Sequence, residues 1–310
     1  MREEIEISVV IPLYRCSGTI EELCVRLKKV FLKLNVTYEV ILINDGSPEN
    51  DWEVASKLSE GNNDIKSINL SRNFGQHPAI FCGLENTKGE WVVVMDGDLQ
   101  DVPEEIEKLY NKALEGFPIV LGAREERKDT FTKKLGSLIF YKILNFFTGS
   151  NLSHQVGNYG VYHKDVIFSV LSLGDAIKFL PTMVNWVGYN KIVVPVKHAK
   201  RLEGSSSYSF GKLLSLAFDN IVSFSNKPLK IFVKFGFLLV FISVLMIVYN
   251  LYLHLSNHIV VQGYSSIIIS IWFLSGCLIS IMGVIGVYLG KVFDKVKARP
   301  SYIVCQKKNL

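Results

Sequence analysis

Two apolar segments near the C-terminal end constrain this chain more than any other feature. They run from about 235 to 255 and from about 267 to 290. Each has the roughly 20 residues that an α-helix needs to cross the hydrocarbon core of a bilayer. Lysines and arginines precede the first segment and follow the second, whereas the connecting stretch SNHIVVQGYSS has neither. The positive-inside rule therefore predicts a transmembrane hairpin at 227–297 with both ends in the cytoplasm.

The composition agrees with partial burial in lipid. Hydrophobic residues make up 49% of the 310 residues and the mean hydropathy is +0.25, which is apolar for a soluble protein. The net charge is +5, and the basic residues gather around the apolar segments, which favours an anionic membrane surface over nucleic acid as the partner. The five cysteines form no CxxC pair, so we expect reduced thiols. No signal peptide precedes the first domain, so we expect it to stay cytoplasmic, most naturally at a bacterial inner membrane.

Upstream of the hairpin, short runs of β-branched residues alternate with longer amphipathic runs. This alternation is typical of βαβ units in a mostly parallel sheet. Strands are predicted at 7–11, 39–43, 65–70, 91–95 and 119–121. Helices are predicted at 19–34, 51–58, 78–85 and 103–115. In such a sheet, ligands bind where the carboxyl ends of the strands meet.

Two basic amphipathic helices are predicted to follow, at about 131–148 and 210–225. The first has its apolar residues largely on one face, so it either lies in the headgroup region of a membrane or packs on its own domain. We therefore divide the chain into a first domain at 1–226, the hairpin, and a cytoplasmic tail at 298–310. Glycines spaced along the second apolar segment allow helices to approach closely, either within this chain or between the chains of a homo-oligomer.

The stretch MDGDLQD carries the strongest chemical signal. Asp96 and Asp98 stand two residues apart at the end of an apolar strand, and Gln100 and Asp101 add further oxygen atoms. Oxygen ligands in this arrangement point to a hard divalent cation that is shared with substrate phosphates. The alternative is a solvated acidic turn, which the preceding strand disfavours.

Two further loops carry candidate donor-binding residues. Asp45 and Ser47 follow the second predicted strand and can accept hydrogen bonds from a base or a ribose, or they cap the helix that begins near Asp51. Tyr14 follows the first strand, which ends at Pro12, and can stack on a nucleobase or pack in the core.

Three arginines stand in loops that follow predicted strands. A guanidinium group binds a diphosphate in a bidentate manner, although surface arginines without such a role are common. The candidates are Arg72, Arg124 and Arg127.

With these residues in place, nearly the whole chain resembles the family 2 glycosyltransferases of GT-A fold. Within them it is similar to polyprenyl-phosphate sugar transferases of the dolichol-phosphate mannose synthase and bactoprenol glucosyltransferase type. The motifs that carry the resemblance occur in the same order: VVIPLY, INDGS, LSRNFGQHPA, MDGDLQDVPEE, FYKILN, RLEGSSSY and SFSNKPLK.

The resemblance implies direct displacement with inversion at the sugar, without a covalent intermediate on the enzyme. It implies a nucleoside site formed by Pro12, Tyr14, Asp45 and Ser47. It implies a Mg²⁺ or Mn²⁺ site formed by Asp96, Asp98 and Gln100. It also implies that phosphates of donor or acceptor face Arg124, Arg127 and Arg201.

Three departures from the family pattern affect these roles. Arg15 and Cys16 stand where relatives carry Asn-Glu. Asn158 stands where many relatives carry an acidic residue, and Ser207 where they carry a lysine. The last two concern the acceptor side.

The predicted function is transfer of a sugar from a nucleotide donor to a polyprenyl phosphate, which is already anionic at neutral pH and needs no general base. An alternative acceptor is a hydroxyl of a glycolipid, which does need a base, with Asp101 preferred over Asp165. A second alternative is an inactive membrane scaffold, which the intact Asp96, Asp98 and Asp45 disfavour. A processive synthase would need more transmembrane helices than this chain has.

Overall fold

The structure is a computed structural model of the chain. It describes residues 4–124, 145–147, 156–175, 178–199, 221, 225, 227–256 and 263–310. The chain divides into two compact units. The first, the sheet unit, comprises Met1–Phe146, Ser150–Leu214 and Pro300–Leu310. The second, the helical unit, comprises Phe147–Gly149 and Ser215–Arg299.

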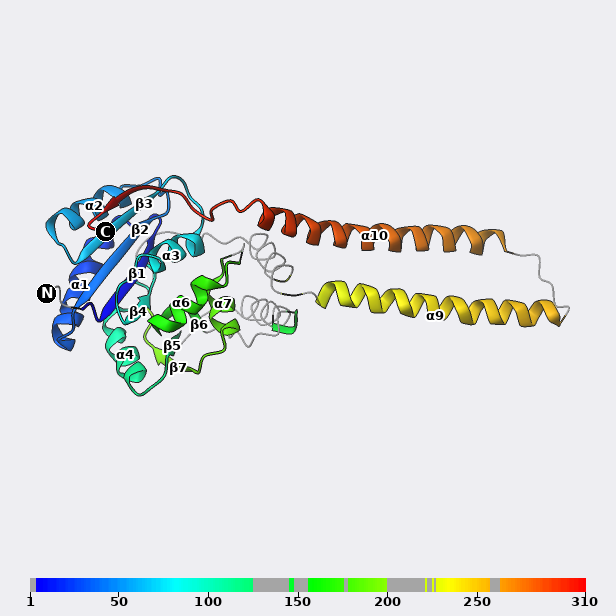
Figure 1. The fold of residues 1–310 in the computed structure, drawn as a ribbon, viewed down its shortest axis with the longest axis horizontal. Coiled ribbons are helices and arrows are strands. Elements are labelled where there is room, and N and C mark those ends of the chain that lie inside the picture. The colour runs from blue at the N-terminus through cyan, green and yellow to red at the C-terminus, as the bar shows by residue number, and fades with distance from the viewer. Residues whose placement is uncertain are drawn as a thin grey trace. The chain divides into compact units, whose positions relative to one another are not determined.

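The sheet unit contains an eight-stranded, mostly parallel sheet in its described residues (Figure 1). The spatial order of the strands is β7-β5-β6-β4-β1-β2-β3-β8. Only β6 and β8 run against the other described strands. The bounds are β1 Ile7–Leu13, β2 Tyr38–Asn44, β3 Ile65–Leu70, β4 Trp91–Val94, β5 Ile119–Arg124, β6 Val156–His163, β7 Lys191–Val196 and β8 Val304–Lys308.

Helices cover both faces of this sheet (Figure 1). One face carries α1 Ile20–Leu34, α2 Asp51–Gly61 and α4 Ile106–Leu114, which follows the 3₁₀ turn η1 Pro103–Glu105. The other face carries α3 Gln76–Leu84, α6 Lys164–Ser172 and α7 Leu180–Trp186.

Strand β1 is buried on both of its sides. Ile7, Val9 and Ile11 lie in one buried cluster with Leu23 of α1. Val10 faces the other way, where its Cγ1 lies so close to Gly83 of α3 that a Cβ atom there would come within 2.4 Å of it. A strand covered on both faces needs a nearly continuous apolar run, which β1 provides apart from Ser8, whose buried hydroxyl donates to Oε1 of Glu39 at 2.5 Å.

The strands and helices that we predicted in the first 121 residues are confirmed, with ends that shift by a few residues. The largest chemical consequence concerns α3. We placed its start at Pro78, a residue favoured in the first turn of a helix, but the helix begins at Gln76. The backbone of Gln76 is therefore part of the helix, at the edge of the sheet where the parallel strands end.

The last residues of the chain correct our assignment of 298–310 to a tail. Val304–Lys308 forms β8, which pairs antiparallel with β3 from Ser67 to Leu70. Asn309 then donates from Nδ2 to the carbonyl oxygens of Ile65 at 3.0 Å and Asn62 at 3.2 Å. The physical reason is that β3 would otherwise expose the unpaired N–H and C=O groups of a sheet edge.

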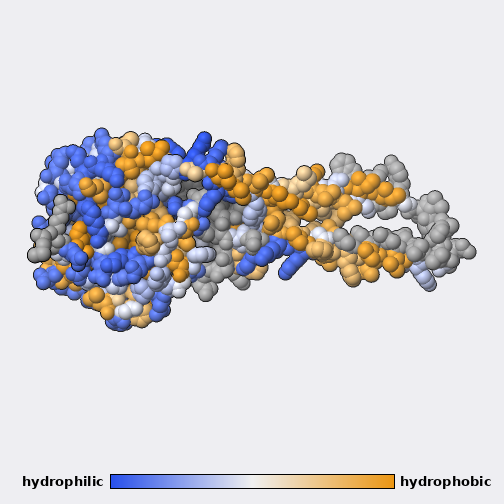
Figure 2. All heavy atoms as spheres, viewed as in Figure 1, coloured by the Kyte–Doolittle hydropathy of each residue, from blue (hydrophilic) through white to orange (hydrophobic). Residues whose placement is uncertain are grey.

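The helical unit consists of two long helices in the described residues, α9 Lys227–Leu255 and α10 Tyr264–Val296. Many of their large apolar side chains are exposed, as Figure 2 shows by its hydrophobic colouring along both helices. One described stretch, Phe273–Val296, is long and apolar enough to cross a membrane. The predicted interface helices at 131–148 and 210–225 fall almost entirely outside the described residues.

Candidate active site

The loops at the carboxyl ends of β1 to β4 are joined by hydrogen bonds. The N–H of Asp45 donates to the carbonyl of Leu13 at 3.0 Å, and the N–H of Arg15 donates to Oγ of Ser47 at 3.1 Å. Thr19 donates from its hydroxyl to the carbonyl of Gly97 at 2.6 Å. Candidate residues that are far apart in the sequence are thus held along one edge of the sheet, as the parallel arrangement requires.

Asp45 joins the loop after β2 to the loop after β3. It is 2% exposed, and its two carboxylate oxygens accept from the N–H groups of Phe74 at 2.7 Å and Gly75 at 2.9 Å. Burial raises the pKa of Asp45, whereas these two N–H groups and the guanidinium of Arg72 lower it. Asp45 therefore fixes the geometry of the loop that leads into α3.

The two loops approach each other closely at Gly46. Its φ of 59° lies in the left-handed region, and a Cβ atom there would lie 2.4 Å from the carbonyl carbon of Arg72. The interpretation of Asp45 and Ser47 as caps of α2 is wrong, because the helix begins after Asn50 and neither side chain accepts from its first N–H groups. Asp45 accepts from Phe74 and Gly75 before α3, and Ser47 accepts from the N–H groups of Arg15 and Glu49.

The aromatic and basic candidates near this edge are accessible. Tyr14 is 40% exposed and lies beside the guanidinium of Arg15, 5.6 Å from the ring centre, so it is not a core tyrosine. Arg72 is exposed and stacks over the ring of Phe74 at 4.1 Å. Pro12, half-buried near the end of β1, lies opposite Ile43 of β2.

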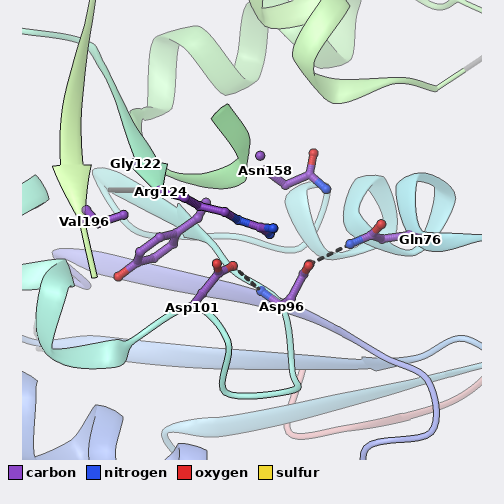
Figure 3. Close-up of a pocket in the computed structure, with 9 residues that line it drawn as sticks. Gln76, Asp96, Asp101, Gly122, Arg124, Asn158 and Val196 are labelled. Atoms are coloured by element: carbon purple, nitrogen blue, oxygen red, sulfur yellow. Dashed lines mark hydrogen bonds between the residues drawn. The ribbon is translucent and has the colours of Figure 1, made fainter. Parts of the chain in front are cut away.

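The acidic loop after β4 is internally braced. The N–H of Asp96 donates to Oδ2 of Asp101 at 3.1 Å, and the N–H of Gln100 donates to Oδ1 of Asp98 at 3.1 Å. From outside the loop, Nε2 of Gln76 donates to Oδ1 of Asp96 at 2.6 Å. Figure 3 shows Asp96 between Gln76 and Asp101.

A polar cavity of about 180 Å³ opens beside this loop. It brings together three residues that we predicted for the site, Asp96, Asp101 and Arg124 (Figure 3). The remaining lining residues are Gln76, Gly122, Gly157, Asn158, Tyr159 and Val196. Asn158, the amide at the family's acidic position, is therefore part of the cavity.

The other candidate residues lie outside the lining of this cavity. Those along the neighbouring loops are Pro12, Tyr14, Asp45, Ser47, Arg72, Asp98 and Gln100. Arg127 and Arg201 fall outside the described residues. Asp165 is exposed in the first turn of α6, beyond the end of β6 that is distant from Asn158, which removes it as a candidate base.

The cavity places the carboxyl groups of Asp96 and Asp101 in one lining together with the guanidinium of Arg124. Asp101 is 6% exposed, and its pKa is raised to about 7 by burial and then by the charge of Asp96, while the N–H of Asp96 and the charge of Arg124 lower it. Carboxylates that raise one another's pKa are stabilised by a cation.

The oxygen atoms of Asp96, Asp98 and Gln100 suit Mg²⁺ or Mn²⁺, because these ions prefer hard oxygen ligands. In the part of the chain that the structure describes, no group of three or more His, Cys, Asp or Glu side chains is arranged to hold a metal ion.

Two residues of this site were missed by sequence reasoning. Gln76 stood within a family motif but had no assigned role. His198 lies after β7, where its Nδ1 is 3.7 Å from Oδ1 of Asp101 and the two residues form a β-bridge. The N–H of Ala199 also donates to the carbonyl of Gln100 at 2.9 Å. No spacing in the sequence links residue 198 to residue 101, so only tertiary structure reveals this contact.

An open, mostly parallel sheet with carboxylates at the end of a central strand is the arrangement of GT-A glycosyltransferases. The fold is similar to that of glucosyl-3-phosphoglycerate synthase from Mycobacterium tuberculosis, with a TM-score of 0.52 and 16% identity over 71% of this chain and 77% of that one. Residues 8–169 match the model of glycosyl transferase family 2, and the chain belongs to this family.

Full-length relatives agree with this assignment. An uncharacterized glycosyltransferase of Synechocystis sp. is 36% identical over 304 residues, which cover 97% of this chain and 95% of the relative. The undecaprenyl-phosphate 4-deoxy-4-formamido-L-arabinose transferase of Salmonella choleraesuis is 33% identical over 310 residues, which cover 97% of this chain and 93% of the relative. The chain is therefore a glycosyltransferase.

Proposed function

We propose that this glycosyltransferase transfers a sugar from a nucleotide-sugar donor to a polyprenyl phosphate at the cytoplasmic face of a membrane. The observation that carries the proposal is the cavity at the end of β4, in which Asp96, Asp101 and Arg124 meet. The Salmonella relative, named for transfer to undecaprenyl phosphate, is similar over nearly the whole length of both chains, including the helical unit.

The donor nucleoside would occupy the edge formed by the loops after β1 and β2. The exposed ring of Tyr14 offers a stacking surface next to Pro12, and the oxygen atom of Ser47 offers an acceptor for a base or ribose. Asp45, whose two carboxylate oxygens accept from Phe74 and Gly75, would serve the nucleoside site by holding the loop that borders it. Arg72, Arg124 and Arg127 would face the diphosphate, since guanidinium groups pair with phosphates through two parallel hydrogen bonds.

Asp96, Asp98 and Gln100 would hold Mg²⁺ or Mn²⁺ together with the donor diphosphate. A bound ion neutralises the charge that builds on the departing diphosphate. The mycobacterial synthase with the similar fold is described as a complex with Mn²⁺ and uridine diphosphate, which supports the same ligand chemistry here.

The acceptor phosphate would attack the sugar directly, with inversion. Its second pKa is near 6, so its oxygen is largely anionic at neutral pH and no base is required. The protein's part is then to align the two reactants and to compensate charge, for which we assign Arg124 and Arg201. Asn158 suits a cavity that admits an anionic acceptor phosphate, because a neutral amide does not repel the phosphate whereas a carboxylate would.

The helices α9 and α10 would form the transmembrane hairpin, with the sheet unit and both chain ends in the cytoplasm. Basic residues at the outer ends of the hairpin, including Lys227, Lys230 and Lys295, support this orientation. Association with further copies would use the glycine face of α10, where Gly276 and Gly283 have open space around them.

The test uses the full chain, purified in detergent, with Mn²⁺, a panel of nucleotide sugars and a short polyprenyl phosphate. Formation of a sugar-phospholipid product that stops when the metal is chelated is the expected result. Full activity in the presence of a chelator would contradict the metal site. Turnover only with glycolipid acceptors would contradict the polyprenyl-phosphate acceptor.

The buried carboxylate of Asp101 favours one second candidate, transfer to a hydroxyl of a glycolipid. That reaction needs a base near the attacking oxygen, and Asp101 is a carboxylate that lines the cavity. Under this alternative, Asp101→Asn abolishes turnover with the hydroxyl acceptor. An inactive scaffold, in contrast, gives no product with any acceptor.

A further inference from the structure

Gln76 lines the cavity and contacts the acidic loop, but it has no role in the proposed reaction so far. It is the first residue of α3, and it reaches across from the end of β3 to the loop after β4. Its Nε2 lies 2.6 Å from Oδ1 of Asp96 (Figure 3).

The chemistry of this contact fixes its direction. An ionised carboxylate has no proton to give, so the NH₂ group of the amide faces it. The main-chain N–H of Asp96 is held in turn by Oδ2 of Asp101 at 3.1 Å. Asp96 is thus restrained at its backbone and at one carboxylate oxygen, and this sets the direction in which its second oxygen points.

The position of Gln76 is itself determined by Asp45. The two residues before the helix, Phe74 and Gly75, donate their N–H groups to the Asp45 carboxylate at 2.7 and 2.9 Å. Gly75 has a φ of 104°, which suits glycine, and its carbonyl accepts the first helical hydrogen bond from Ala79 at 3.2 Å. The amide of Gln76 therefore starts from a braced helix end.

We propose that Gln76 is a positioning residue that orients Asp96 for the divalent cation and so joins the nucleoside edge at Asp45 to the cation site. This inference rests on the proposed metal-dependent transfer. Hydrogen-bond partners that orient a metal ligand typically contribute about 10- to 100-fold to metal affinity. We expect an effect of this size from Gln76.

The experiment measures Mn²⁺ binding directly, by electron paramagnetic resonance of the free ion, with the full chain in detergent and with uridine diphosphate present or absent. Two variants remove the contact: Gln76→Ala, and Gln76→Asn, which keeps the amide but is one methylene too short. Gln306→Ala, an exposed glutamine on β8, is the matched control. Thermal unfolding of each variant checks that the fold is kept.

We expect both Gln76 variants to raise the dissociation constant of Mn²⁺ by about 10- to 100-fold. The Mn²⁺ concentration that gives half-maximal transfer should rise by the same factor, while kcat at saturating Mn²⁺ changes far less, because only cation binding is weakened. If Gln76 had a purely structural role, its variants would be less stable to heat, and the Mn²⁺ requirement would not rise while kcat at saturating Mn²⁺ stayed nearly unchanged.

Two results would overturn the inference in distinguishable ways. If the unchanged chain binds Mn²⁺ but Gln76→Ala and Gln76→Asn bind it as tightly as Gln306→Ala does, Gln76 has no positioning role and the proposed function stands. If the unchanged chain itself binds no Mn²⁺ and transfers sugar without it, both the inference and the metal dependence of the proposed function fail.

Discussion

Asp96 and Asp98 stand two residues apart after the same strand, yet they have different surroundings. Asp96 lines the cavity and is held by Gln76, whereas Asp98 accepts from the N–H of Gln100 within its own loop. The two carboxylates are therefore braced from different directions. Replacing Asp98 should therefore affect sugar transfer more than it affects the stability of the fold.

Replacing Asp98 with asparagine tests the acidic pair. We expect Asp98→Asn to lower kcat/KM by about 100-fold or more, because one charged ligand of the cation is lost. Asp98 is only half-buried, so the thermal midpoint should stay close to that of the unchanged chain. Asp64→Asn, at an exposed turn, is the control. Normal turnover of Asp98→Asn would contradict the site assignment.

His77 gives the sheet unit a pH-dependent stability. Its Nδ1 accepts from the N–H of Leu180 at 3.5 Å, its ring packs against Phe179, and burial lowers its pKa from 6.5 to about 4. Between pH 6.5 and 4 the unfolded chain binds a proton that the folded chain does not. The contribution of His77 is therefore fully present above pH 6.5 and is lost as the pH falls towards 4.

We expect the thermal midpoint of His77→Gln to fall less between pH 7 and pH 4.5 than that of the unchanged chain, because glutamine keeps an acceptor for Leu180 but does not titrate. Thermal unfolding at the two pH values measures this difference. An equal fall in both proteins would contradict the role of His77.

The site residues differ in how far sequence alone could identify them. The place of Asp96 beside the cavity was predictable, because it directly follows an apolar strand whose carboxyl end lies at the edge where ligands bind. The role of Asp96 and Asp98 as cation ligands stays a prediction. The places of Gln76 and His198 were not predictable, because each reaches the acidic loop through the packing of elements that are distant in sequence. A hydrogen bond from a helix start to a neighbouring strand end has no local pattern.

Among the elements, the short strand β8 holds the outer edge of the sheet in place. It pairs with β3, and Asn309 at its end donates to the carbonyls of Asn62, Ile65 and Ser59. These acceptors belong to the end of α2 and to the turn that leads into β3. One side chain therefore holds the outer edge of the sheet to the helix beside it.

We expect Asn309→Ala to destabilise the sheet unit by about 1 kcal/mol, since the part-buried carbonyl groups of Ser59 and Ile65 lose their donor. This corresponds to a fall in thermal midpoint of about 2 °C or more. Asn63→Ala, an exposed change in the turn after α2, should have little effect. If both variants unfold at the same temperature, Asn309 does not hold the edge.

The predictability of the elements follows the same logic. The strands and helices of the first 121 residues were predictable because their apolar periodicity is strong. The sequence VCQKK of β8 is short and polar and gives no such signal. It becomes a strand because β3 offers an open edge, which is a property of the folded sheet.

At the scale of the whole molecule, the proposed topology is open to a labelling test. Cys305 on β8 is exposed, and Ser256 follows α9 in the turn towards α10. With a membrane-impermeant maleimide and intact cells, we expect labelling of Ser256→Cys in a Cys305→Ser background. The unchanged chain should be labelled at Cys305 only after the cells are permeabilised. Labelling of Cys305 in intact cells would contradict a cytoplasmic sheet unit.

The place of β8 in the chain also has a consequence for how the enzyme is made. Strand β8, which pairs with the edge of β3, follows α10 in the sequence. During synthesis that edge of β3 therefore has no partner strand until α10 and β8 have left the ribosome. Newly made chains that stall before this point carry an exposed template for unwanted strand pairing. The sheet of the glycosyltransferase unit can therefore be completed only after α10 has been synthesised.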